Sequence, residues 1–85
     1  MNIIQQFVNK KLNGITAEEL MKYSKEYDIA ITVKQCQQVS TLMKGQNINI
    51  YDASERIQLL KKIADVTSIK TAQQVNTLLQ NLVKQ

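Results

Sequence analysis

A chain of 85 residues is enough for one small domain, and a hydrophobic content of 44% can supply one core. With no proline, two glycines and 5% aromatic residues, the composition favours helices around an aliphatic core over a loop-rich or β-sandwich scaffold. The net charge of +4 comes from scattered lysines and one arginine, Arg56, which argues against a dedicated anion-binding patch.

Missing residue types exclude several classes of chemistry. Without histidine, the chain has neither histidine-dependent nucleophilic catalysis nor a histidine metal site. The one cysteine, Cys36, allows no internal disulfide and falls on the apolar face of a predicted helix, where we expect a buried thiol. No apolar run approaches the roughly 18 to 20 residues of a membrane span, and no signal-peptide pattern opens the chain. We therefore expect a cytoplasmic protein.

The first helix should run from a cap at Asn2 to Asn13, because apolar residues recur along it at three- and four-residue spacing. Residues 15–20 (ITAEEL) and 31–36 (ITVKQC) then repeat one helix-start signal. In each, a threonine follows an apolar residue and stands three positions before a Glu or Gln, which is the pattern of a capping box with a hydrophobic staple. The second and third helices should therefore begin after Thr16 and Thr32.

These two helices should end near Tyr27 and at Lys44. Gly14 and Gly45 stand just after the first and third helices, where we expect left-handed C-terminal caps. Residues 46–51 are ambiguous: Ile48 and Ile50 alternate with asparagines, as in a short extended segment, but Asn49 could also cap the next helix one turn early.

Asp52 is the preferred cap of the fourth helix, because Glu55 follows it at the capping-box distance. That helix should run to about Val66, and the fifth should restart at Thr67 and Ser68. The pattern predicts an all-α, compact irregular or orthogonal bundle of five short helices, forming a single domain over residues 1–85.

The apolar face of each predicted helix gives the expected core. Its members are Ile3, Ile4, Phe7, Val8 and Leu12 on the first helix; Leu20, Met21, Ser24 and Tyr27 on the second; Cys36, Val39, Leu42 and Met43 on the third; Ala53, Ile57, Leu60, Ile63 and Ala64 on the fourth; and Ala72, Val75, Leu78, Leu79, Leu82 and Val83 on the fifth.

The seven acidic residues show no catalytic pattern. Glu18, Glu19, Asp52 and Glu55 are accounted for as caps or first-turn residues, and no spacing brings two carboxylates into one pocket. Residues 47–55 lack the central glycine and the alternating acidic ligands of a calcium loop. No glycine-rich phosphate loop is present. We expect no enzymatic activity, no cofactor and no metal.

Two kinds of binding function fit the pattern. The second and third helices could form a helix-turn-helix, with Lys34, Gln37, Gln38 and Lys44 among its nucleic-acid contacts. Four acidic residues on and just after the second helix, and the absence of an arginine cluster, weigh against nucleic-acid binding. A membrane-surface role for residues 2–13 is weaker still, because that helix holds only two lysines.

A protein-interaction or regulatory module is the preferred hypothesis. The terminal helices carry wide apolar stripes that three short helices would not bury completely, so a partner or a second copy should cover them. The residues expected at this surface are Ile4, Phe7, Val8, Leu78, Leu79 and Leu82. We expect a homodimer whose interface includes the first or the fifth helix.

Three segments carry a resemblance that covers essentially the whole chain: residues 9–12 (NKKL), 15–20 (ITAEEL) and 44–52 (KGQNINIYD), the last followed by Glu55 and Arg56. Together they resemble a family of short uncharacterised proteins from Gram-positive endospore-forming bacteria, classed as a domain of unknown function. The Asn-Ile-Asn-Ile stretch is the most particular part. The resemblance implies a cytosolic bacterial protein and assigns no functional residue.

Overall fold

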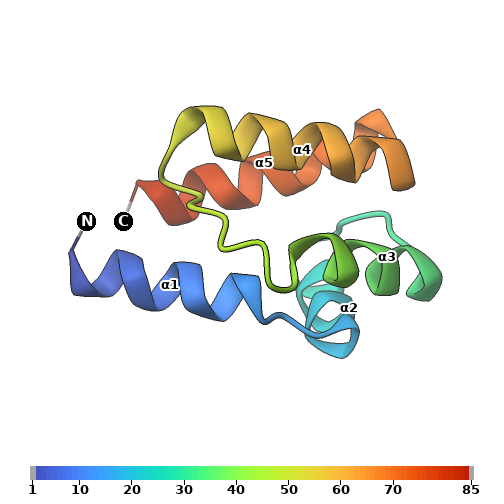
Figure 1. The fold of residues 1–85 in the computed structure, drawn as a ribbon. Helices are drawn as coiled ribbons and strands as arrows, with labels where there is room; N and C mark the ends of the chain where they lie inside the picture. The colour runs from blue at the N-terminus through green and yellow to red at the C-terminus, as the bar shows by residue number, and fades with distance from the viewer. Residues whose placement is uncertain (1, 85) are drawn as a thin grey trace.

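The computed structural model describes residues 2–84, which form five α-helices (Figure 1). Their bounds are α1 Ile3–Asn13, α2 Ala17–Glu26, α3 Val33–Met43, α4 Ala53–Val66 and α5 Ile69–Val83. The all-α fold and the number of helices predicted from the sequence are confirmed.

A side chain caps the start of every helix. In α2 the Glu19 amide donates to Thr16 Oγ1 over 3.1 Å, and in α3 the Gln35 amide donates to Thr32 Oγ1 over 3.1 Å. Both predicted capping boxes are complete. Asp52 caps α4, so the prediction that preferred it over Asn49 is confirmed.

The helices are arranged as two pairs and a separate first helix. α4 and α5 form a hairpin, α2 packs on α3, and α3 also approaches α4 closely. α1 belongs to none of these close pairs within the described residues. It lies alongside the bundle, with the start of α1 and the end of α5 on the same side of the view (Figure 1).

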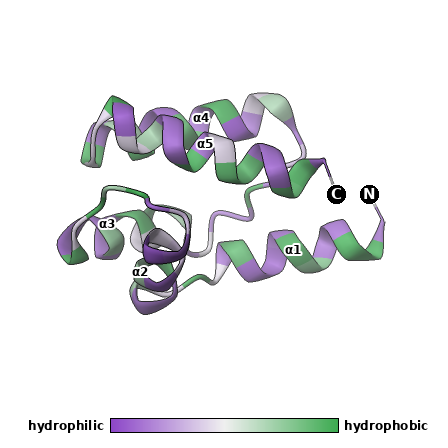
Figure 2. Cartoon of the chain, turned by 180° about the vertical axis from the view of Figure 1, so that it is seen from behind, coloured by the Kyte–Doolittle hydropathy of each residue, from purple (hydrophilic) through white to green (hydrophobic). Residues whose placement is uncertain are grey.

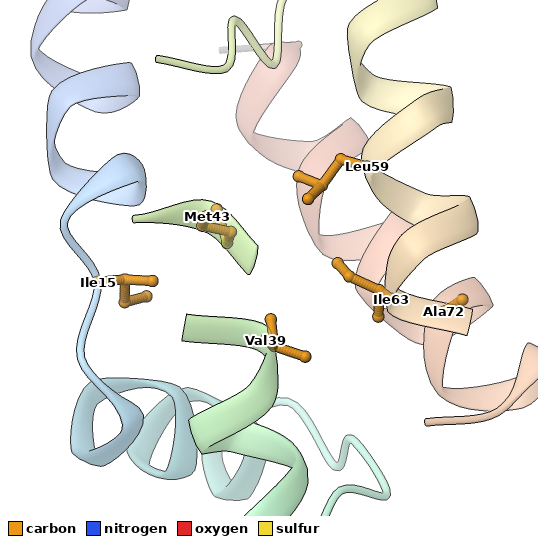
Figure 3. Close-up of a cluster of buried hydrophobic side chains, with 6 residues drawn as sticks. All are labelled: Ile15, Val39, Met43, Leu59, Ile63 and Ala72. Atoms are coloured by element: carbon orange, nitrogen blue, oxygen red, sulfur yellow. The ribbon is translucent and has the colours of Figure 1, made fainter. Parts of the chain in front are cut away.

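The buried core joins α3, α4 and α5 to the connection between α1 and α2 (Figure 3). Its main members are Ile15, Val39, Met43, Leu59, Ile63 and Ala72. The core is therefore aliphatic, as the low aromatic content indicates.

The predicted inner face of α4 is partly wrong. Ala53 is exposed and Ile57 is 51% exposed, whereas Leu59, which the prediction omitted, is buried with Ile63. α4 packs against both α5 and α3, and this double contact turns the helix so that Leu59 and Ile63, one turn apart, face inward. Apolar spacing alone does not set that rotation.

Part of the apolar stripe of α1 stays uncovered, as expected for a terminal helix, and one core prediction in α2 is wrong. Ile3, Ile4 and Phe7 are exposed because α1 stands apart from the helix pairs and no element covers its first two turns. Tyr27 is also exposed, because it is the C-cap of α2 and lies beyond the helix's packed face.

The two glycines differ in conformation. Gly45 has a φ of +74°, the left-handed conformation expected after α3. Gly14 has a φ of −113°, so the prediction of a left-handed cap after α1 is wrong. Its amide instead bonds the Leu12 and Lys11 carbonyls in an ordinary tight turn, which any residue can adopt.

Alanine substitutions should separate the two glycines. Gly45→Ala should lower the free energy of unfolding by about 1 kcal/mol or more, because a Cβ is strained at positive φ. Gly14→Ala should be neutral or stabilising by about 0.4–1 kcal/mol, since its Cβ would meet only the Lys10 and Lys11 carbonyl oxygens at 3.7 and 4.0 Å. Urea denaturation followed by circular dichroism measures both; equal losses would contradict the assigned backbone conformations.

The two capping boxes should respond differently to pH. Hydrogen bonds from the Thr16 amide and hydroxyl, with smaller help from Lys11 and Lys22, hold the pKa of the Glu19 carboxyl below its ordinary value of 4.5. A carboxyl with a lowered folded-state pKa stabilises the fold above its unfolded pKa and loses that contribution as the pH falls through the folded value.

Glu19→Gln, which copies the neutral Gln35 of the second box, should therefore lose less stability than the parent between neutral pH and about pH 3. Urea midpoints measured across that range provide the comparison. Parallel pH profiles for the two proteins would show that the carboxylate form of Glu19 adds nothing to the cap.

Candidate functional site

A deep apolar cavity opens between α1 and the rest of the bundle. Its volume is about 260 Å³, and side chains from all five helices and from the connection between α2 and α3 line it. We call it the apolar slot. The floor consists of buried core residues, namely Val39, Met43, Leu59, Ile63 and Leu79. The slot is therefore an extension of the core that reaches the surface.

The slot gathers most of the residues predicted for an interaction surface. Phe7 and Val8 from α1 line it together with Leu78, Leu79 and Leu82 from α5. These two segments come from opposite ends of the sequence and lie across from one another, with hydrophobic residues recurring along both (Figure 2). The sixth predicted residue, Ile4, is exposed on α1 and does not line the slot. Their role in binding a partner stays a prediction.

A set of hydrogen bonds, which we call the asparagine lock, holds α1 in its position beside the bundle. It joins Asn9 and Asn13, one turn apart on α1, to residues 48–50. The Ile48 amide donates to Asn13 Oδ1 over 2.7 Å, and Asn13 Nδ2 donates back to the Ile48 carbonyl over 2.8 Å. Asn9 Nδ2 donates to Asn49 Oδ1 over 2.8 Å. Since α1 has no close helix neighbour, these polar contacts fix its place.

Ile50 is the buried centre of the lock. Its side chain is fully buried, and its amide donates to Asn9 Oδ1 over 3.1 Å. Its carbonyl accepts from Nη1 of Arg56, the one arginine of the chain, over 2.8 Å. Side chains thus satisfy both backbone polar groups of a buried residue, one from the distant Asn9 and one from Arg56 in the next helix.

Sequence reasoning missed the lock. It gave Asn9 no structural role, although Asn9 is buried. The available signal was a pair of asparagines four residues apart on one helix, combined with a second asparagine-rich segment at residues 47–49. Asparagine carries both a donor and an acceptor, so it can bond to a backbone amide and carbonyl as a strand would.

A second set of polar contacts fixes the connection between α2 and α3. The Gln74 side chain accepts from the Ala30 amide over 3.0 Å and donates to the Asp28 carbonyl over 3.1 Å. The buried Thr71 hydroxyl donates to the Ala30 carbonyl. This connection carries Ile29 and Ile31 into the wall of the slot, so its position shapes the cavity.

Charge is sparse around the slot. Among its lining residues Lys11 is the one charged side chain, and the Tyr23, Tyr27 and Ser24 hydroxyls supply the other polar groups. Cys36 does not line it: the thiol is buried, its Sγ lies 3.2 Å from Met21 Sδ, and burial raises its pKa. A raised pKa keeps the thiol protonated and unreactive at neutral pH.

The residues predicted to contact nucleic acid all lie at the surface. Lys34, Gln37 and Gln38 are exposed on α3, and Lys44 is its exposed C-cap. Gln37 borders a shallow hollow that it shares with Glu18 of α2. Lys22 and Lys25 also line this hollow, so its charge neither excludes a phosphate backbone nor forms an arginine cluster for one.

Residues 2–84 contain neither a membrane-spanning helix nor a cluster of metal-ligating side chains. No helix in that range is long and apolar enough to cross a membrane. No three acidic, histidine or cysteine residues gather there in a way that would hold a metal ion.

The fold and the slot define a small all-α protein with an apolar cavity. Residues 1–83 match the family described as a protein of unknown function, DUF2624, and the chain belongs to this family. The chain is also similar to the uncharacterized protein YqfT of Bacillus subtilis (strain 168), with 45% identity over 78 residues that cover 92% of this chain and 93% of the relative. No solved structure matches the chain. The resemblance to a bacterial family of unknown function is therefore confirmed.

The asparagine lock should contribute measurably to stability. Asn9→Ala leaves the buried Ile50 amide without its acceptor, which should cost about 1–3 kcal/mol of unfolding free energy. Asn81→Ala, at an exposed position of α5, is the matched control and should stay within about 0.5 kcal/mol of the parent. Urea denaturation gives both values. A cost at Asn9 no greater than at Asn81 would show that the lock does not hold α1.

Proposed function

We propose that the protein is a non-catalytic interaction module that pairs with a second copy of itself through the outer surface of α1. The observation that carries this proposal is the exposure of Ile3, Ile4 and Phe7, at 81%, 70% and 68%, on the first two turns of α1. We call these three residues the α1 stripe. Large apolar side chains clustered at this exposure are costly in water unless a partner covers them.

The charge pattern of α1 favours a second copy as that partner. In a two-fold dimer each residue near the axis faces its own copy, so a charge there would be opposed by an equal charge. Residues 3–9 carry no charge, and the lysines of α1 come only in its last turn, at Lys10 and Lys11. Two α1 stripes can therefore meet without like-charge repulsion.

The setting we propose is the cytoplasm of Gram-positive endospore-forming bacteria. The Bacillus subtilis relative supports the bacterial part of this proposal. Nucleic-acid binding through Lys34, Gln37, Gln38 and Lys44 is the alternative function. It ranks second because the chain has one arginine, Arg56, and its guanidinium is already bonded to the Ile50 carbonyl.

A matched pair of charge insertions tests the dimer. Ile4→Glu should convert a dimer to a monomer, because it places two carboxylates at the proposed axis. Ile69→Glu is the control: Ile69 is 73% exposed, lies in the first turn of α5 and should leave the dimer intact. Glutamate in a first helical turn is favourable in both, so neither variant should unfold.

Light scattering coupled to size exclusion, over a wide concentration range from about micromolar upward, measures the mass of each variant. A parent protein with the mass of one chain throughout would reject the dimer. Dissociation by both substitutions equally would place the interface elsewhere.

A further inference from the structure

The apolar slot is larger than a packing defect. A dry apolar cavity of about 150 Å³ is already enough to bind a small hydrophobic molecule such as benzene. The slot has about 260 Å³ and ends on side chains that belong to the buried core, such as Leu59, Ile63 and Met43. Its lining side chains lack contact partners on the open side, so an apolar ligand would gain dispersion contacts that water cannot supply.

The shape and size favour a slender ligand. A protein helix would rest on a surface stripe, whereas this cavity descends between α1 and α5 to the core. Taking roughly 30 Å³ for a group the size of a water molecule, the volume corresponds to a chain of about nine methylene groups. A two-chain lipid is too large for this space.

The polar groups of the slot favour an anionic head group. Lys11 is the one charged residue that lines it, and no carboxylate does. Tyr23 and Tyr27 are also lining residues, and a tyrosine side chain carries a hydroxyl that can donate a hydrogen bond. The positive charge of Lys11 helps to lower the pKa of Glu19. The Glu19 carboxylate nevertheless stays in the capping box, where it accepts from the Thr16 amide and hydroxyl, each over 3.1 Å.

We propose that the apolar slot binds a single-chain carboxylate of about ten to twelve carbons, with about nine carbons of its tail on the core floor and the rest, with the carboxylate, at the open end beside Lys11. The site is independent of the proposed dimer surface, because Ile4 lies outside the slot. Phe7 is the one residue of the α1 stripe that reaches the slot, so it is left unchanged in the test.

Isothermal titration of the full chain with sodium dodecanoate, below its micelle concentration, measures the binding directly. One saturable site per chain is expected. Lys11→Glu should weaken dodecanoate binding about tenfold, whereas Lys10→Glu, an exposed neighbour that does not line the slot, should change it less than about twofold. Binding of uncharged dodecanol should be unchanged in both variants, because it depends on the tail alone.

A filled-slot variant and a dimer variant complete the test. Val75→Phe puts a larger ring into the lining and should abolish binding of both probes in a chain whose helical circular dichroism is retained. Ile4→Glu should leave dodecanoate binding unchanged, so failure of the dimer and failure of the slot can be told apart. The proposal is overturned by the absence of saturable binding, by equal weakening in the two lysine variants, or by loss of binding in Ile4→Glu.

Discussion

The position of α1 depends on a few hydrogen bonds between its asparagines and a non-helical segment, and the rest of the surface follows from that. A helix packed on others by an apolar face is drawn as close as its side chains allow. α1 is held by two asparagine side chains, which bond to the backbone of residues 48–50, together with Leu12, which packs against the core. Standing off in this way, it leaves the apolar slot on one side and the α1 stripe uncovered on another. If α1 packed more closely against the other helices, the slot between them would close.

Side-chain hydrogen bonds to the backbone also hold the connection between α2 and α3. Thr71 and Gln74, three residues apart on α5, bond to the backbone of residues 28–30 much as the asparagines of α1 bond to residues 48–50. An irregular segment near a core has amides and carbonyls that no neighbouring strand satisfies, and leaving them unbonded is costly. Short polar side chains on helices satisfy them while fixing the connection in one conformation. In so small a protein, these contacts add the specificity that a limited apolar core cannot supply alone.

The helix caps, which depend on neighbouring residues, could be predicted from the sequence, whereas contacts between segments far apart in the chain could not. Thr16, Thr32 and Asp52 act within their own first turns, so a window of a few residues is enough to find them. The bond from Ile50 to Asn9 spans 41 residues, and no local pattern reveals that two asparagine-containing segments meet. The rotation of α4 is a similar case, since Leu59 rather than Ile57 turns inward because of contacts with α3 and α5. Five of the six residues predicted for the candidate surface do gather, because both terminal helices had unusually wide apolar faces.

α1 contributes to the asparagine lock, the α1 stripe and the apolar slot through largely different residues. At 100° per residue, Asn9 and Asn13 lie roughly opposite the α1 stripe, and Val8 and Leu12 lie between them and line the slot. Lys11, which also lines the slot, lies on the stripe's side of the helix, one turn after Phe7. A chain filling the slot would contact α1 from within and oppose any shift of the helix about its lock. Because Ile4 lies outside the slot, a substitution there changes the α1 stripe and leaves the contacts of a ligand with Val8 and Leu12 as they are.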